Sequence, residues 1–202
     1  MRNFWLVRPN PHNHYAMGYF LTKHRIAVGY PLGEDLTDHN YRDIKILLEG
    51  KGWPAGLSNV NILVREMNPG DWVIVPDENG REVYIGEVTS DYKYVEELDE
   101  DKPGSGFPHQ REVEWFFDGK PFLRSELPGP IKDSLRYPGA VANLTKHLSL
   151  MEETLGVEVE NDSLDRNSTE EVIDFLLSVV KNEEIEMENR LRAAEIILNS
   201  KK

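Results

Sequence analysis

The feature that most restricts the fold is a β-hairpin predicted within residues 68–95. Two apolar runs rich in β-branched and aromatic residues, 72–75 and 83–88, flank the polar loop 76–81. Runs of this composition, bounded by Pro, Asn and Gly, are typical of two paired strands joined by a turn of several residues. The pair Asn79-Gly80 tolerates the positive φ that such a turn needs. The sequence therefore predicts an antiparallel sheet.

Apolar spacing predicts further strands and short helices around this hairpin. Apolar runs predict strands at 4–8, 26–30 and 111–116. Helical spacing predicts helices at 15–23, 41–48, 60–67 and 131–135, although 60–67 also alternates as a strand would. The second of these helices is expected to begin at the capping signal Asp35-Leu36-Thr37-Asp38. No Gly-x-Gly-x-x-Gly follows a strand and there is no Walker loop, so we expect an α+β fold built on a small, mixed, partly closed barrel.

The C-terminal part of the chain differs from the rest in spacing and charge. Residues 141–153 have apolar side chains near helical spacing, and residues 161–167 form a polar linker. Two apolar stripes behind a capping acid then predict a helical hairpin at about 168–200. We therefore expect one domain at 1–138 and an acidic helical tail at 139–202. Binding of an effector protein and formation of a homodimer both stay open as roles for the tail.

Composition excludes several classes of protein. None of the 202 residues is cysteine, which excludes disulfides, thiolate metal sites and cysteine nucleophiles. No apolar run approaches the roughly 20 residues that a membrane span needs. The polar and charged start, MRNFW, does not fit a signal peptide. We therefore expect a cytoplasmic protein without a membrane partner.

The net charge of −13 is unevenly distributed along the chain. Residues 1–95 are nearly neutral, whereas most of the acidic excess lies in the acidic loop 96–102 and in residues 151–202. A near-neutral domain can present a basic face, although its affinity for phosphates is then modest and sensitive to salt. The acidic balance therefore does not exclude a nucleic acid as the partner.

The patterns of common catalytic and metal sites are missing. No His-Glu-x-x-His motif and no Gly-x-Ser-x-Gly elbow occurs, and no acid/base pair stands out. His12 and His14 lie two residues apart in a loop, but two histidines without nearby carboxylates make a weak metal site. We therefore expect no cofactor, no metal and no enzymatic activity.

The aromatic residues indicate a binding role. Trp5, Trp72 and Trp115 fall within predicted strands, and we interpret them as core. Four other rings fall at strand ends or in loops, where the rim of a pocket would lie: Tyr30, Trp53, Tyr92 and Tyr94. Tyr92 and Tyr94 share one face at strand spacing. Rings arranged in this way can hold a flat, electron-rich ligand such as a nucleobase.

Basic side chains occur close to these rings in the sequence. They are Arg8, Arg65, Lys93, His109 and Arg111. Each by itself is typical of a solvated surface charge. Together, on strand ends that adjoin the tyrosines, they could follow a phosphate backbone.

An ordered set of segments resembles a known family. The segments are FWLVR (4–8), IAVGY (26–30), DLT (35–37), GDxVxVP (70–76), IGEVTxDYxY (85–94) and HxRxVxW (109–115). Together they resemble the EVE-like domain of the PUA/YTH superfamily, of the type found at the N-terminus of modification-dependent restriction proteins. The resemblance covers roughly residues 3–130.

The resemblance implies a PUA-like β-barrel with flanking short helices that reads a modified base by flipping it into an aromatic cage. Tyr30 would occupy the position of a cage aromatic that is often Trp in relatives, so its stacking surface is smaller here. Trp53, Tyr92 and Tyr94 would complete the cage, and Asp35 could accept a hydrogen bond from the base edge. Backbone contacts would come from Arg8, Lys93, His109 and Arg111. We therefore expect a non-catalytic reader of a modified nucleobase in DNA, within a restriction or defence system.

Three alternatives are left open by the sequence. The first is an RNA-binding module of the same superfamily that prefers methylated single-stranded RNA. The second is a protein-interaction scaffold that acts through the acidic helical tail. The third is an enzyme, such as a nuclease acting on RNA, whose catalytic pair would be split across loops.

Overall fold

The computed structural model describes residues 2–156 and, beyond them, Val180, Met187 and Leu191. The chain divides into two compact units at Gly156, and the first unit is the one described below. The predicted linker at 161–167 and nearly all of the predicted helical hairpin at about 168–200 lie outside the described residues.

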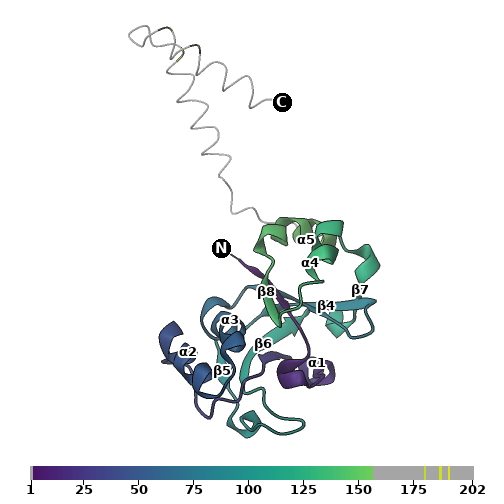
Figure 1. Ribbon diagram of the computed structural model, residues 1–202. Helices are drawn as coiled ribbons and strands as arrows, with labels where there is room; N and C mark the ends of the chain where they lie inside the picture. The colour runs from purple at the N-terminus through teal and green to yellow at the C-terminus, as the bar shows by residue number, and fades with distance from the viewer. Residues whose placement is uncertain (1, 157–179, 181–186, 188–190, 192–202) are drawn as a thin grey trace. The chain divides into compact units, whose positions relative to one another are not determined.

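A single mixed sheet of eight strands forms the centre of the described unit (Figure 1). The strands are β1 (Phe4–Val7), β2 (Arg25–Val28), β3 (Trp72–Pro76), β4 (Glu82–Val88), β5 (Lys93–Tyr94), β6 (His109–Trp115), β7 (Phe122–Leu123) and β8 (Val141–Asn143). Pairing follows the order β2-β6-β4-β3-β1-β8, with β5 paired to β6 and β7 paired to β4. Only β1 and β3 run parallel among these pairs, and the other pairs are antiparallel.

Short helices surround this sheet. They are α1 (Met17–Lys23), α2 (Tyr41–Gly50), α3 (Leu57–Asn61) with a π-helical turn (Ile62–Glu66) directly after it, α4 (Gly129–Ser134) and α5 (Leu148–Leu155). In the view of Figure 1, α4 and α5 lie together at one end beside β8, whereas α2 and α3 lie along one side. Within the described residues, no helix has both the length and the apolar character that crossing a membrane would require.

The central strands are buried on both faces, which explains their continuous apolar sequences. Along β1, Phe4 and Leu6 belong to one hydrophobic core, and Trp5 and Val7 belong to the other. The core around Trp5 also contains apolar side chains of α1, α2 and α3. The core around Phe4 contains side chains of α4 and α5. Each face of the sheet is therefore covered by its own set of helices.

The sheet curls, so that its two edge regions approach each other. Gly29 and Tyr30 directly follow β2, which stands at one end of the pairing order, and Ala140 directly precedes β8 at the other end. These residues line one hollow together with Arg8 at the end of β1. The protein is thus an α+β protein with a curled, mixed half-barrel sheet and short helices.

Most predicted elements are present, with shifted ends. The hairpin is formed by β3 and β4, the strands at 4–8, 26–30 and 111–116 are β1, β2 and β6, and residues 57–66 are helical. The core positions predicted for Trp5, Trp72 and Trp115 are confirmed, since all three are buried.

The predicted start of the second helix is wrong. Asn40, rather than the segment 35–38, is the N-cap of α2, because the Asn40 side chain accepts hydrogen bonds from the backbone N–H groups of Arg42 and Asp43. The Asp43 carboxylate completes a capping box by accepting from the Asn40 backbone. Asp35 instead accepts bonds from the N–H and hydroxyl of Thr37, which closes a local turn.

The predicted helix at 141–153 begins as a strand. Residues 141–143 pair with β1, and the α-helix starts only at Leu148. The helical spacing of the apolar residues is overridden here by the hydrogen bonds that an open sheet edge offers. The first compact unit consequently extends beyond the expected boundary at residue 138, to Gly156.

Candidate functional site

The candidate site is a hollow of about 340 Å³ where the two edge regions of the curled sheet approach each other. Its walls come from the end of β1 and the turn after it, from the residues that follow β2, from Trp53 after α2, and from the segment before β8. The lining residues are Arg8, Asn10, Pro11, His12, Asn13, Gly29, Tyr30, Trp53, Pro138 and Ala140.

Two aromatic rings form one side of this hollow. Tyr30 and Trp53 are both half-buried, and their ring centroids lie 6.2 Å apart with planes tilted by 60°. The Tyr30 ring lies directly against Gly56, where an added Cβ would come within 2.5 Å of the ring carbon Cε1. Asn59 donates a hydrogen bond of 3.4 Å from Nδ2 to the Tyr30 hydroxyl. The sequence Pro-Ala-Gly after Trp53 therefore provides the flat backbone against which Tyr30 packs.

Strained backbone is concentrated around the hollow. His12, Asn13 and Tyr30 have φ values of 51°, 58° and 75°, and they make up half of the non-glycine residues with positive φ in the described part of the chain. Such conformations are costly for residues with a Cβ, by about 1–3 kcal/mol each, and they occur preferentially at functional sites. The strain thus singles out this hollow from the others.

A buried hydrogen-bond chain holds Tyr30 in its left-handed conformation. His109 is fully buried and donates from Nε2 to the Tyr30 carbonyl oxygen at 3.1 Å. The Nδ1 atom of the same ring then accepts from the Tyr92 hydroxyl at 2.9 Å, and that hydroxyl accepts from the Leu36 N–H. Burial lowers the pKa of His109 to about 4, so the ring is neutral and the directions of these bonds are fixed.

The four predicted cage rings do not surround one hollow. Tyr30 and Trp53 line the candidate site, whereas Tyr92 lines a different hollow and supports Tyr30 through His109. Burial raises the pKa of Tyr92, in keeping with its inward position. Tyr94 donates to the Asp99 carboxylate at 2.5 Å. Asp35 is exposed and does not line the candidate site.

One of the five basic side chains expected at a phosphate backbone lines the hollow. Arg8 is half-buried there, and its guanidinium donates to the carbonyl oxygens of Leu135 and Tyr137. Burial and the nearby Arg124 charge lower the pKa of Arg8. Arg65 lies elsewhere and donates to the His39 carbonyl, and Lys93 donates to the Glu112 carboxylate at 2.6 Å.

The other two basic residues are buried. Arg111 is 3% exposed, and its guanidinium donates to the carbonyl oxygens of Leu63, Val64 and Ser90 at 2.6, 3.0 and 3.0 Å. Two of these carbonyls belong to the π-helical turn, whose backbone acceptors need a donor inside the protein. In this conformation, neither Arg111 nor His109 is on the surface, and both serve the structure.

The sequence analysis missed part of the lining. Asn10, Asn13, Pro138 and Ala140 carried no binding prediction, and His12 was considered only for a metal. The available signal was the loop composition of Pro9-Asn10-Pro11-His12-Asn13, since Asn and His are enriched in left-handed conformations. Among the described residues, no group of three or more His, Asp or Glu side chains could hold a metal ion.

Comparison with known proteins gives a family without a known function. The family model described as a domain of unknown function (DUF8426) matches residues 5–130. The chain belongs to this family. No curated protein matches the sequence. Among solved structures, a match is the crystal structure of the protein Atu2648 from Agrobacterium tumefaciens, with 18% identity, coverage of 77% of this chain and 93% of that chain, and a TM-score of 0.35.

The DUF8426 match includes most of the candidate site. Both rings, the loop that contains His12, and His109 all fall within residues 5–130. Pro138 and Ala140 follow the matched region, although they contribute to the wall of the same hollow. The residues that position and line the aromatic side therefore belong to the family domain.

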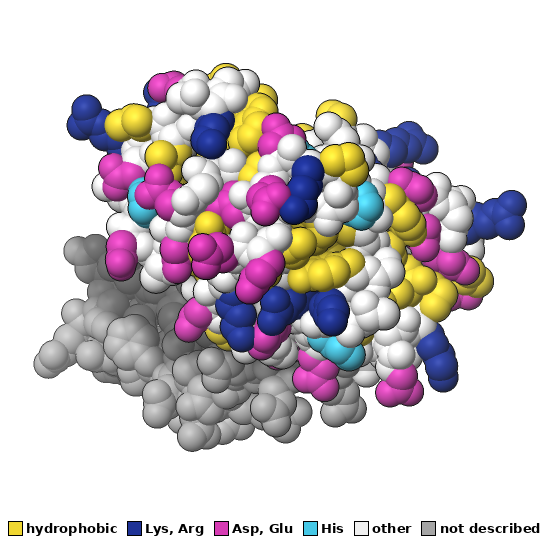
Figure 2. Space-filling view, turned by 90° about the horizontal axis from the view of Figure 1, so that it is seen from below, with side chains coloured by type: hydrophobic (Ala, Val, Ile, Leu, Met, Phe, Trp, Pro, Cys, Tyr) yellow, Lys and Arg dark blue, Asp and Glu magenta, His cyan; other side chains and the backbone are white. Residues whose placement is uncertain are grey.

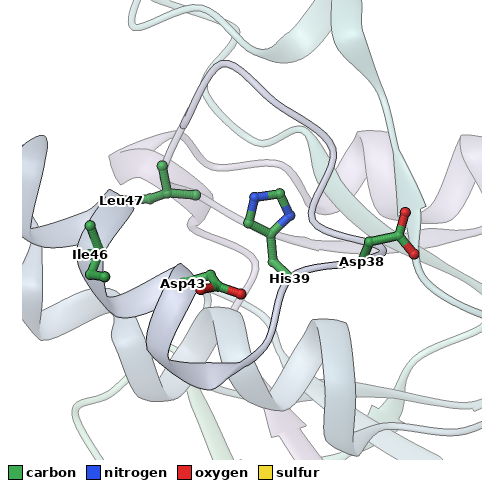
Figure 3. Close-up of a pocket in the computed structure, with 5 residues that line it drawn as sticks. All are labelled: Asp38, His39, Asp43, Ile46 and Leu47. Atoms are coloured by element: carbon green, nitrogen blue, oxygen red, sulfur yellow. The ribbon is translucent and has the colours of Figure 1, made fainter.

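A second hollow, of about 300 Å³, lies at the start of α2 (Figure 3). Figure 3 shows His39 between Asp38 on the loop and Asp43 on the helix, with the aliphatic side chains of Ile46 and Leu47 beside it. The His39 Nε2 atom lies 3.0 Å from a Glu34 carboxylate oxygen. Because carboxylates line this hollow and no carbocyclic aromatic ring does, it is poorly suited to a nucleotide.

Charge on the visible surface is mixed in sign. Figure 2 shows Lys and Arg side chains interleaved with Asp and Glu, and hydrophobic side chains exposed between them. A mixed surface does not produce the extended positive field of a strongly basic nucleic-acid-binding protein. On this face of the DUF8426 domain, charge alone therefore does not identify a site for nucleic acid.

Proposed function

We propose that the hollow beside Tyr30 and Trp53 receives one modified nucleobase, and that the protein is a non-catalytic reader of modified DNA. In this proposal the curled sheet is a PUA-like barrel of the EVE type, in keeping with the ordered sequence segments that resemble that family. The observation that carries the proposal is the pair of half-buried rings in a hollow framed by strained backbone.

The size of the hollow supports a single base as its occupant. A volume of about 340 Å³ lies at the lower end of the range for small-molecule sites, which is roughly 300–1,000 Å³. It is large enough for a purine or a pyrimidine with a small substituent. A longer stretch of nucleic acid would have to lie outside the hollow, which is the arrangement that base flipping produces.

The chemistry of the lining supports the same occupant. Stacking of a base on an aromatic side chain contributes about 1–3 kcal/mol. Extruding a base from a duplex costs a few kcal/mol, and because the two ring planes are tilted by 60°, a flat base would stack on one ring and contact the other at its edge, which offsets part of that cost. Arg8, at the rim, adds a cation that can contact a flanking phosphate, at the expense of its present bonds to the Leu135 and Tyr137 carbonyls.

Few phosphate contacts are available, and this has a measurable consequence. Only Arg8 among the expected basic residues lines the hollow. Each neutralised phosphate contributes about −0.9 to the slope of log K against log salt concentration. We therefore expect a shallow slope of about −1 to −2 and an affinity that depends mainly on the base.

The context proposed for this reader is a restriction or defence system, in which an effector acts on the DNA that the domain has bound. The roles predicted for the acidic C-terminal residues, recruitment of an effector protein or formation of a homodimer, fit that context.

Binding of labelled duplexes tests the proposal directly. Fluorescence anisotropy at low salt would compare duplexes that contain N6-methyladenine, 5-methylcytosine or 5-hydroxymethylcytosine with the unmodified duplex. We expect one modified duplex to bind at least tenfold more tightly. Trp53→Ala and Tyr30→Ala should each lower that affinity by about tenfold, in line with the loss of one stacking partner.

Tyr41→Ala is the matched control, because Tyr41 is an exposed tyrosine on α2 that does not line the hollow. It should leave the affinity unchanged. Equal and negligible binding to every duplex would refute the proposal, and so would binding that survives both ring substitutions. Preferential binding of methylated single-stranded RNA would favour the RNA-binding alternative instead.

A further inference from the structure

His12 is placed in the hollow by contacts that leave its ring little freedom. Its ring packs edge-on against Trp53, with centroids 5.6 Å apart and planes at 77°. Its Nε2 atom lies 2.8 Å from Oδ1 of Asp101, which is on the acidic segment that precedes β6. His12 is thus a polar group beside the aromatic side of the candidate site.

Two glycines pack directly against His12. A Cβ on Gly29 would come within 2.5 Å of the His12 backbone nitrogen, and a Cβ on Gly106 would come within 2.5 Å of the ring atom Cδ2. Real Cβ atoms do not approach other heavy atoms this closely, so both positions have to lack a side chain. His12 itself is held at a positive φ of 51°. The chain therefore accepts strain and close packing to keep this imidazole in place.

The contacts of His12 leave one ring nitrogen available. Because a carboxylate only accepts hydrogen bonds, Asp101 requires a proton on Nε2, and the neutral ring then has an unprotonated Nδ1. Within the described part of the chain, Nδ1 has no hydrogen-bond partner, and it is not among the unpaired buried side-chain atoms. It is therefore an accessible acceptor on a side chain that lines the hollow.

We propose that His12 is a specificity-determining residue whose Nδ1 accepts a hydrogen bond from the amino group of the bound base, and that Asp101 is the positioning residue that fixes its tautomer. This inference rests on the proposed function and deepens it. The ligand is then an aminopurine or aminopyrimidine that retains at least one N–H on its exocyclic nitrogen. A base whose exocyclic nitrogen is fully alkylated is rejected, because Nδ1 would be left without a donor.

Two pairs of bases test the contribution of the last N–H on the exocyclic nitrogen. N6-methyladenine and N6,N6-dimethyladenine form one pair, and N4-methylcytosine and N4,N4-dimethylcytosine form the other. Each base would be placed opposite an abasic site in a labelled duplex, so that differences in pairing strength do not contribute. We expect the wild-type protein to bind the monomethyl member of the pair that it accepts about tenfold more tightly than the dimethyl member.

Substitutions of His12 separate hydrogen bonding from shape. His12→Phe keeps a ring edge against Trp53 but has no acceptor, so the preference should fall below about twofold. His12→Asn places a polar amide atom near the position of Nδ1 and tolerates a positive φ, so much of the preference should remain. If His12→Phe keeps the full preference, the discrimination comes from the size of the extra methyl group, and the inference is overturned.

Asp101 is tested by rescue with a conservative variant. Asp101→Ala should lower the preference about threefold, whereas Asp101→Asn, whose amide oxygen still accepts from Nε2–H, should restore it. An unchanged preference in Asp101→Ala overturns the positioning role. If the wild-type protein binds no modified duplex, the proposed function fails together with this inference. If it binds and Trp53→Ala weakens binding about tenfold while His12→Phe leaves the preference unchanged, only this inference fails.

Discussion

Replacing Arg111 by Met removes a cation that the structure uses inside the protein. Arg111 is 3% exposed, and its guanidinium donates to three backbone carbonyls, two of which belong to the π-helical turn after α3. Burial lowers the pKa of Arg111, which means that the charged form carries a desolvation cost. Met fills a similar volume but leaves those carbonyls without their donor.

The size of the effect follows from these contacts. A hydrogen bond to a charged group contributes about 1.5–3 kcal/mol, and part of the total over three bonds is offset because Met removes the desolvation cost of the guanidinium. We therefore expect the free energy of unfolding to fall by about 3 kcal/mol. For a unit of this size, that corresponds to a loss of roughly 6–12 °C in Tm. The stability of Arg111→Lys should lie between those of the wild type and Arg111→Met, because an ammonium cannot reproduce the planar set of N–H donors of a guanidinium.

Urea unfolding followed by tryptophan fluorescence measures this difference. Arg65→Met is the matched control, because Arg65 is exposed and its guanidinium donates to the carbonyl oxygen of His39. The control should cost about 1 kcal/mol or less. If Arg111→Met stays within about 0.5 kcal/mol of the wild type, which is the range for surface substitutions, the structural role assigned to Arg111 is wrong.

Three further substitutions test other contacts. Asp71→Asn should lower the free energy of unfolding by about 2 kcal/mol in a urea titration. Every hydrogen-bond partner of the buried Asp71 carboxylate is a donor, among them the Trp5 indole N–H at 2.8 Å. The NH₂ group of an amide would face one of these donors and lose that bond. The pKa of His109 is lowered to about 4, so as the pH falls below about 6.5 the unfolded chain binds a proton that the folded protein does not take up. The free energy of unfolding should therefore fall by about 3 kcal/mol between pH 6.5 and 4. In His109→Gln, the free energy of unfolding should depend less on pH over this range. Gly56→Ala should displace the Tyr30 ring and weaken base binding at least fivefold, as measured by anisotropy, whereas Gly50→Ala, whose new methyl meets no atom within 4 Å, should not.

The strands were predictable because burial on both faces produces apolar runs that cannot be solvated loops. This applies to β1 and β3, whereas β4 alternates buried with half-buried side chains and was predicted from its β-branched and aromatic residues and the Asn79-Gly80 turn before it. Residues 141–143 show where local pattern fails. Their spacing suits a helix, but the open edge of β1 offers backbone partners 136 positions earlier in the chain, as in the pair Leu6 and Ala142. Local spacing carries no information about such a distant partner.

The candidate site was predictable only in part, for a related reason. Tyr30, after a strand, and Trp53, in a loop, were identified because aromatic residues at such positions often lie at the rim of a pocket. Tyr92 and His109 follow the same pattern, yet their polar atoms bond to each other in the interior. The alternation of a strand shows which face a side chain takes, but the curl of the sheet decides whether that face is inside or outside. His12 was missed because its position depends on two glycines distant in sequence, Gly29 and Gly106.

The central position of β1 has a consequence for synthesis of the protein. Phe4 pairs with Trp72, and Leu6 pairs with both Ile74 and Ala142, so β1 leaves the ribosome before both of its partner strands and is fully paired only after β8 has been made. During translation β1 is an apolar segment with unpaired backbone N–H and C=O groups, which other nascent chains or chaperones can bind. Because its partner strands come much later in the chain, we also expect slow folding. A fragment that stops at residue 138 would keep one side of β1 uncovered and should accumulate as aggregate, whereas a fragment that continues to Gly156 should be recovered folded.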